Sequence, residues 1–313
     1  MYPVTAVLAA LLLISACQKA PTAPAPRQIH LVGSIAAYPF SVAVAERFMR
    51  EETEAVAPLA QADGTGSGIV RFCAGLGSTH PDLIGAARAM TAAERAGCAK
   101  NGIGDIAEIP FGWSALVFVT RPDTPALAPT RADLQQALSG AASGAANDWH
   151  AIDPALPALR IALHGPTPSP ALADGLFGPI LAPDAVVRTD GLYRPHGADA
   201  DAVIRAVLET PGTIGLVPWA YAVKHGDTLR LLPIDGVTPD AATIASGRYP
   251  ARLPLILYAK PAEVASVPGL PKLLADYAEG WGQGGAFAGA GLIPLTPAAQ
   301  AEAGRQITAI ARR

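Results

Sequence analysis

The apolar run LPLILYA spans residues 253–259, and a second continuous run, ALVFVT, spans residues 115–120. Neither run carries a charge, and both are rich in aliphatic residues, which is typical of strands buried on both faces of a sheet. The two runs bracket a central segment of the chain. This arrangement predicts one α/β domain inserted into another, with two hinge strands that cross between them.

Strand-like and helix-like patterns alternate along most of the remaining chain, which predicts two α/β lobes. Thr91 with Glu94, and Thr130 with Asp133, have the spacing of side chains that cap the start of a helix. We expect the first lobe to comprise residues 28–120 and 253–313, and the inserted second lobe to comprise residues 121–252. Strand-like stretches fall at 28–32, 56–62, 82–86, 160–163, 213–217 and 229–232, and the later helical stretches at 200–208, 270–281 and 297–311.

Composition narrows the classes of function. Hydrophobic residues make up 50% of the 313 residues and charged residues 16%, which predicts a large buried core. The chain has 23 Lys and Arg against 26 Asp and Glu, a balance that argues against a nucleic-acid partner. The six histidines are scattered, and no zinc-protease or serine-hydrolase motif occurs. We therefore expect no catalytic residues, no metal site and no cofactor.

The first residues predict export from the cytoplasm. The apolar run 4–16 is too short to cross a hydrocarbon core of about 30 Å, but it has the length of a signal peptide's apolar region. Residues 13–17 resemble a bacterial lipobox, which implies a signal peptide over 1–16 and lipidation of Cys17. The proline-rich segment 17–27 would then be an extended tether to a membrane anchor in the periplasm. A buried N-terminal strand or helix with a chance cysteine is the alternative.

Two cysteines remain once Cys17 is assigned to the lipid. Cys73 and Cys98 form an even pair, and an oxidising compartment favours a disulfide between them. Such a bridge closes a loop of about 25 residues and stabilises the fold by roughly 3 kcal/mol in the chain-entropy model. Two buried free thiols are the alternative. Two cysteines without a clustered histidine do not make a zinc site.

A glycine-rich stretch, GTGSG, occupies residues 64–68 between a strand-like and a helix-like segment. Glycines let the backbone approach a ligand closely, and the N–H groups at a helix start favour an anion. The hydroxyls of Thr65 and Ser67 add two further donors. The stretch lacks the lysine of a nucleotide-binding phosphate loop, and Ile69 stands where the dinucleotide motif has its last glycine. It predicts an anion-binding loop or, alternatively, a tight structural turn.

Arg88 follows the strand-like stretch 82–86. A guanidinium at the carboxyl end of a strand can bind an oxyanion with two parallel N–H groups. A salt bridge at the surface is the alternative role for this side chain.

Six stretches of the chain resemble, in the same order, the phosphate-binding lipoproteins of high-affinity phosphate ABC importers. They are GSIAAYPF (33–40), GTGSGIVRFCAG (64–75), PDLIGAARAM (81–90), PGTIGLVPWAYA (211–222), YPARLPLILYA (249–259) and GLIPL (291–295). Together they extend over nearly the whole chain after the N-terminal segment. The resemblance implies the type II periplasmic-binding-protein fold, in which two α/β lobes hold a phosphate between them.

The resemblance also implies a ligand set of helix N-termini, hydroxyl groups and one arginine. In the first lobe, the residues that fall on or beside the family's positions are Ser34, Tyr38, Thr65, Gly66, Ser67 and Arg88.

The second lobe departs from the family's pattern. The family's Ser-Gly-Thr loop is replaced here by Pro170, Ala171 and Leu172, which leaves Thr167 and Ser169 as candidate ligands, with His164 as a further substitute. Each hydrogen bond to a charged ligand stabilises the complex by about 1.5–3 kcal/mol, so three or four lost donors would weaken a sub-micromolar site toward millimolar.

We expect a periplasmic, lipid-anchored solute-binding protein that captures inorganic phosphate or a related small oxyanion and presents it to an ABC permease. Two alternatives remain open. One is an accessory or sensory binding lipoprotein whose ligand has changed or been lost. The other is a hydrolase of phosphate esters, which is disfavoured because no nucleophile with a neighbouring base is evident in the sequence.

Overall fold

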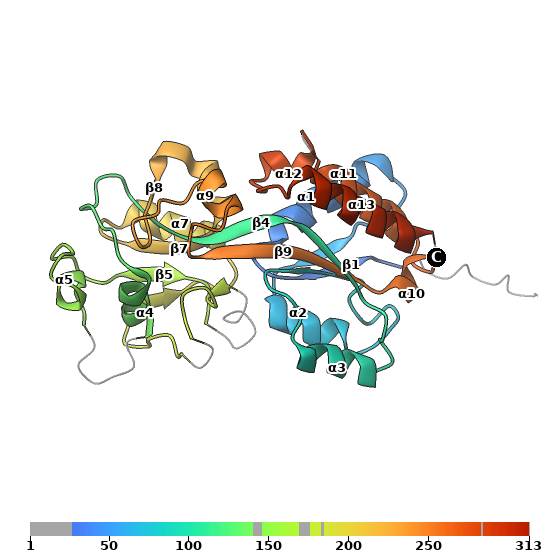
Figure 1. Cartoon of the computed structure of the whole chain (residues 1–313), viewed down its shortest axis with the longest axis horizontal. Coiled ribbons are helices and arrows are strands. Elements are labelled where there is room, and N and C mark those ends of the chain that lie inside the picture. The colour runs from blue at the N-terminus through green and yellow to red at the C-terminus, as the bar shows by residue number, and fades with distance from the viewer. Residues whose placement is uncertain (1–26, 140–145, 169–175, 183–184, 283, 313) are drawn as a thin grey trace, which may run out of the picture.

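Two long antiparallel strands join the two lobes of the molecule (Figure 1). The structure is a computed structural model, and it describes residues 27–139, 146–168, 176–182, 185–282 and 284–312. Strand β4 (Ala107–Thr120) leads from the first lobe into the second, and β9 (Arg252–Ala259) returns. Both apolar runs lie in these strands, which confirms the prediction of two hinge strands.

The first lobe has parallel strands beside the hinge strands. They are β1 (His30–Gly33), β2 (Leu59–Gln61) and β3 (Leu83–Ala86), and the strand order is β2-β1-β3-β9-β4. One face of this sheet is covered by α1 (Tyr38–Glu51), α11 (Leu270–Gly280), α12 (Ala286–Gly289) and α13 (Pro297–Ala311). The other face is covered by α2 (Thr65–Phe72) and α3 (Ala92–Lys100), and the short α10 (Pro261–Val264) follows β9 (Figure 1).

The second lobe continues from β4 with the order β4-β7-β5-β6, and β8 pairs with the end of β4. Its strands are β5 (Leu163–Gly165), β6 (Tyr193–Pro195), β7 (Ile214–Pro218) and β8 (Arg230–Leu231). Its helices are α4 (Arg131–Ser139), α5 (Trp149–Ile152), α7 (Ala200–Glu209), α8 (Trp219–Ala222) and α9 (Ala241–Ala245), with a 3-10 turn at Val223–Thr228.

Two strand predictions need correction. The stretch 160–163 was expected to be a strand, but β5 begins at Leu163, because Arg160 forms an isolated bridge with Asp148 instead of joining the sheet. The first half of β4 was not expected, since Pro110 and Gly112 interrupt the apolar pattern. The strand tolerates both residues through a shift of register against β9 between them. The expected capping box of Thr91 and Glu94 is confirmed at the start of α3.

A disulfide joins Cys73, at the end of α2, to Cys98 in α3. Both cysteines are buried among the side chains that pack these two helices onto the sheet. The alternative of two free thiols is therefore wrong. The bridge fixes the layer of α2 and α3 on its side of the first lobe.

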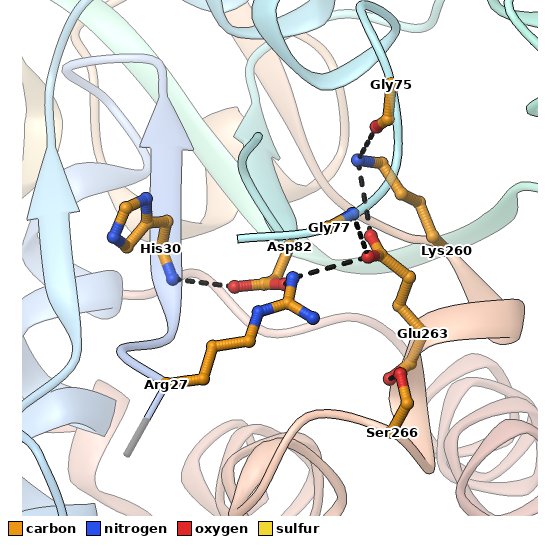
Figure 2. Close-up of polar contacts among 8 residues, drawn as sticks. All are labelled: Arg27, His30, Gly75, Gly77, Asp82, Lys260, Glu263 and Ser266. Carbon is orange, nitrogen blue, oxygen red and sulfur yellow. Dashed lines mark hydrogen bonds and ion pairs between the residues drawn. The ribbon is translucent and has the colours of Figure 1, made fainter. Parts of the chain in front are cut away.

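Buried charges lie at the outer end of the first lobe (Figure 2). The Arg27 guanidinium lies between two carboxylates, 2.6 Å from Asp82 Oδ1 and 3.3 Å from Glu263 Oε1. The Lys260 ammonium donates to the Gly75 carbonyl at 2.6 Å and lies 3.4 Å from Glu263 Oε2. Asp82 precedes β3 and Lys260 follows β9, so these groups lie at the ends of both strands that point away from the second lobe. We call the four charged residues Arg27, Asp82, Lys260 and Glu263 the outer ion cluster.

Candidate functional site

The parallel strands of the two lobes point their carboxyl ends at each other. Strand β3 is antiparallel to β9, with Ala86 opposite Ile256, so it ends on the side of the second lobe. Strand β7 is antiparallel to β4, with Leu116 opposite Pro218, so it ends on the side of the first lobe. Ligands of α/β proteins bind at the carboxyl ends of parallel strands. The candidate site is therefore the region between the two strand edges.

The backbone is closely packed where β1 and β3 end, at the edge of the first lobe that faces the second. Ser34 follows β1, and its N–H donates to the Gly85 carbonyl at 2.8 Å. Gly33 has a φ of +138°, and a Cβ there would lie 2.1 Å from the Gly85 oxygen. Only glycine fits at this position, because the ends of β1 and β3 approach so closely. The hydroxyl oxygen of Ser34, which is buried, accepts a hydrogen bond from the Ala36 N–H at 3.1 Å.

The glycine-rich stretch begins helix α2 at this same edge. Gly64, with a φ of +94°, donates its N–H to the Gly33 carbonyl at 2.8 Å. Thr65 is 1% exposed, and its Oγ1 accepts a hydrogen bond from the Ala87 N–H at 3.1 Å. Gly66 and Ser67 are half-buried in the first turn, where N–H groups have no carbonyl partner within the helix. The stretch thus lies against the ends of β1 and β3.

Tyr38 begins helix α1 beside Ser34, whose carbonyl accepts the Tyr38 N–H at 3.0 Å. The Tyr38 side chain is half-buried. Burial raises the pKa of Tyr221 in α8 of the second lobe, and the nearby Asp201 and Tyr38 raise it further. Tyr38 thus lies near Tyr221 of the second lobe.

Arg88 forms a two-pronged ion pair with Glu94. Its Nη1 and Nη2 lie 2.8 Å and 2.6 Å from the two carboxylate oxygens, and both side chains are about one-fifth exposed. Burial raises the pKa of Glu94, but hydrogen bonds from Arg88 and from the Thr91 N–H outweigh it and lower that pKa overall. The positive charge of Arg88 is thus matched by a carboxylate of α3. The salt bridge, one of the two roles that the sequence allowed, is observed, and the ligand role of Arg88 stays a prediction.

The facing loop of the second lobe follows β5. Thr167 exchanges two hydrogen bonds with Gly197, both at 2.9 Å: its N–H donates to the Gly197 carbonyl, and its Oγ1 accepts the Gly197 N–H. The Tyr193 hydroxyl donates to the Pro166 carbonyl at 2.6 Å. These bonds hold the loops after β5 and β6 together. Ser169 and the replaced Ser-Gly-Thr positions lie outside the described residues.

Two histidines meet at the same edge of the second lobe. His164 Nδ1 and His196 Nε2 are 2.9 Å apart, and the rings are stacked with centroids 5.1 Å apart. Burial lowers the pKa of His164 to about 4, and the charges of His196 and Arg194 contribute to the shift. From the sequence, His164 was predicted only as a substitute ligand. It could not indicate the pair, because 32 residues separate the two histidines and only the pairing of β5 with β6 brings them together.

Sequence reasoning missed Arg252 and Trp113 on the hinge strands. The guanidinium carbon of Arg252 lies 3.1 Å from the centroid of the Trp113 ring. Its Nε is buried and has no hydrogen-bond partner in the described part of the chain. The only indication in the sequence is a charged residue at the start of an otherwise apolar strand.

No second candidate site is found among the other features of the described residues. They contain no group of three or more His, Cys, Asp or Glu side chains that could hold a metal ion. They also contain no helix with the length and hydrophobicity of a membrane span. Two surface pockets of about 530 and 340 Å³ lie on the second lobe, and neither is lined by a candidate ligand residue.

Two α/β lobes joined by a pair of strands that run from one lobe to the other, with the ends of the parallel strands turned toward each other, are the type II periplasmic-binding-protein fold. The sequence model described as "PBP superfamily domain" matches residues 19–283. The chain belongs to this superfamily. No curated protein matches it.

Solved structures confirm the fold. A possible phosphate binding protein from Planctomyces limnophilus DSM 3776 superposes with a TM-score of 0.67 at 23% identity, over 91% of this chain and 99% of that one. A putative phosphate ABC transporter substrate-binding protein from Clostridium perfringens, with bound phosphate, gives 0.63 at 14% identity, over 86% and 100%. A phosphate binding protein from Stenotrophomonas maltophilia gives 0.60 at 12% identity, over 89% and 93%.

Proposed function

We propose that this protein is a solute-binding protein that captures inorganic phosphate, or a related small tetrahedral oxyanion, between its lobes and delivers it to an ABC permease. The observation that carries the proposal is the bond from the Ala87 N–H to Thr65 Oγ1. It ties the start of α2 to the end of β3, where Ser34 and the start of α1 also lie.

The chemistry of this edge suits an anion. Helices α1 and α2 both start here, and neither has an acidic residue in its first turn. The N–H groups and the positive dipole end of a helix start attract negative charge. Ser34, Thr65 and Ser67 add hydroxyl groups, which can donate to phosphate oxygens. The edge offers donors from two helices at one point, which a tetrahedral oxyanion can accept.

The structural relatives support the same ligand. The three proteins compared above are described as phosphate-binding or as phosphate transporter components, and the Clostridium perfringens protein holds phosphate. We assign residues 28–120 and 253–313 to one lobe and 121–252 to the other. The lobes would close around the ligand by rotation near residues 120–121 and 252–253. Capture and release require no covalent chemistry.

We also propose that residues 1–16 are a signal peptide, that Cys17 is lipidated, and that residues 17–27 form a tether. Arg27, the last of these, bonds to Asp82 and Glu263 of the outer ion cluster (Figure 2). The membrane anchor would then leave the body at the end away from the second lobe. Labelled fatty acid incorporated into the wild type but not into Cys17→Ala would support the anchor, and equal labelling would refute it.

A thermal-shift panel with phosphate, arsenate, sulfate, phosphonates and organic phosphates tests the ligand. A ligand at 100 times its dissociation constant stabilises the folded protein by about 2.7 kcal/mol, which raises the melting temperature by several degrees. We expect this shift with phosphate or a close relative. Absence of any shift would favour a sensory or accessory lipoprotein that has lost the ligand. Release of phosphate from a model ester would instead indicate a hydrolase.

A further inference from the structure

Arg252 lies between the two strand edges, closer to the end of β7 than to the end of β3. It is the first residue of β9 and stands opposite Ala115 of β4. The next residue of β4, Leu116, stands opposite Pro218 at the carboxyl end of β7. In the other direction along β9, Ile256 stands opposite Ala86 at the carboxyl end of β3. Ile256 is four residues, or about 13 Å, from Arg252. Arg252 therefore belongs to the stretch of β9 that lies between the lobes.

The register also gives the face on which the guanidinium lies. Side chains alternate along a strand, so Arg252 shares a face with Ile256 and Tyr258. Those two residues pack against α2, through Ile69 and Phe72. Arg252 thus lies on the face of the hinge strands that α2 covers within the first lobe. The anion-binding edge proposed above includes the start of that same helix.

Two neighbours hold the guanidinium in place. The Trp113 ring lies 3.1 Å from its central carbon, a cation–π contact. Gly247 also lies beside the guanidinium, since a Cβ there would come within 2.8 Å of Nη1. The side chain is therefore positioned before any ligand arrives, which reduces the conformational entropy lost on binding.

The charge of Arg252 has no counter-ion among the described residues. Its Nε is buried without a hydrogen-bond partner, and burial is the cause that lowers its pKa. Arg88, by contrast, makes two bonds to Glu94. The Arg252 side chain is half-buried, so part of its charge is withdrawn from water without a counter-ion, and an anionic ligand would supply one.

We propose that Arg252, seated on Trp113, is the cation that binds the oxyanion, and that Arg88 and Glu94 form a positioning pair for the loop after β3. This inference rests on the proposed function in one respect, namely that the ligand is a small oxyanion. It assigns the positive charge that binds the ligand to Arg252, where the resemblance implied Arg88. It also places one ligand contact on the hinge strand itself, so that binding acts directly on the strand about which the lobes rotate.

Calorimetric titration of inorganic phosphate into the wild type and four variants tests the inference. Arg252→Gln removes the charge, and Arg248→Gln removes an equivalent charge from an exposed residue four positions earlier. The double variant Arg88→Gln/Glu94→Gln removes the positioning pair without changing the net charge. We expect the dissociation constant to rise about 10- to 100-fold for Arg252→Gln, as for the loss of a charged hydrogen bond, and less than threefold for Arg248→Gln. The double variant should lose less affinity than Arg252→Gln, and Arg252→Lys should regain part of the loss.

The outcomes separate the two proposals. If the wild type binds phosphate and Arg252→Gln binds it equally well, the inference is wrong and the proposed function stands. If the wild type binds no oxyanion of the thermal-shift panel, both are wrong. Circular dichroism melting curves identify any variant that fails to fold. In that case, the titration of Trp113→Leu, which removes the aromatic ring under the guanidinium, decides the question: unchanged affinity would also overturn the inference.

Discussion

Thr65 Oγ1 accepts the backbone N–H of Ala87 at 3.1 Å, across 22 residues of sequence. The bond joins the first turn of α2 to the residue that follows β3, and it leaves the hydroxyl proton of Thr65 available to a ligand. One side chain thus closes the strand edge and, in the proposed function, donates to the anion. Its removal should affect both stability and binding.

We predict that Thr65→Val keeps the shape of the side chain but leaves the buried Ala87 N–H without an acceptor. The free energy of unfolding, measured by urea denaturation, should fall by about 1–3 kcal/mol. Phosphate affinity should fall at least tenfold, while Thr65→Ser should retain most of both properties. Wild-type affinity in Thr65→Val would contradict a ligand role for this hydroxyl.

The disulfide should contribute substantially to the stability of the first lobe. It closes a loop with a sequence separation of 25 residues, for which the chain-entropy model gives roughly 3 kcal/mol. We expect Cys73→Ser/Cys98→Ser to lose about this amount in urea denaturation. The wild type under reducing conditions should lose a similar amount. A double variant as stable as the oxidised wild type would show that the bridge adds nothing to this fold.

His164 should make stability dependent on pH. Its pKa is lowered from 6.5 to about 4, so between these values the unfolded chain binds a proton that the folded protein does not. The stabilisation is complete above pH 6.5 and is lost as the pH falls toward 4, with a total of up to about 3 kcal/mol.

Urea denaturation at several pH values from 7 to 4 checks this dependence in the wild type and in His164→Gln. The variant should show a shallower loss of stability on acidification. His150→Gln, at an exposed histidine, is the matched control and should follow the wild type. Parallel curves for the wild type and His164→Gln would refute the assignment to His164.

The outer ion cluster should stabilise the fold without affecting the ligand. Lys260 is 1% exposed, and Lys260→Met leaves Glu263 with one cation fewer in a buried setting. We expect a loss of about 3 kcal/mol in the free energy of unfolding, because a buried charge loses its partner. Phosphate affinity should stay within about twofold of the wild type. A large loss of affinity in a folded Lys260→Met protein would show that this end of the lobe communicates with the site.

The main features of the fold could be predicted from local patterns. The two apolar runs mark the hinge strands because burial on both faces leaves no polar alternation, and the spacing of Thr91 and Glu94 marks the start of α3. The first half of β4 could not be predicted. Its proline and glycine are tolerated only because the partner strand β9 accommodates a bulge.

The candidate site was predictable only in part. The glycine-rich stretch and Ser34 are brought to one strand edge, as the resemblance implied. The partners of the charged and titratable groups were not predictable. The pairing of His164 with His196 and the stacking of Arg252 on Trp113 depend on the register of strands far apart in sequence. Local sequence carries no information on such contacts.

The most direct test locates the ligand itself. Crystals of the protein grown with arsenate, a heavier analogue of phosphate, would give an anomalous signal at the arsenic position. The account predicts a single site between the lobes, within hydrogen-bond distance of Thr65 Oγ1 and of first-turn N–H groups of α2, with the Arg252 guanidinium in contact. Arsenic bound only on the outer surface, or absent from the region between the strand edges, would contradict it.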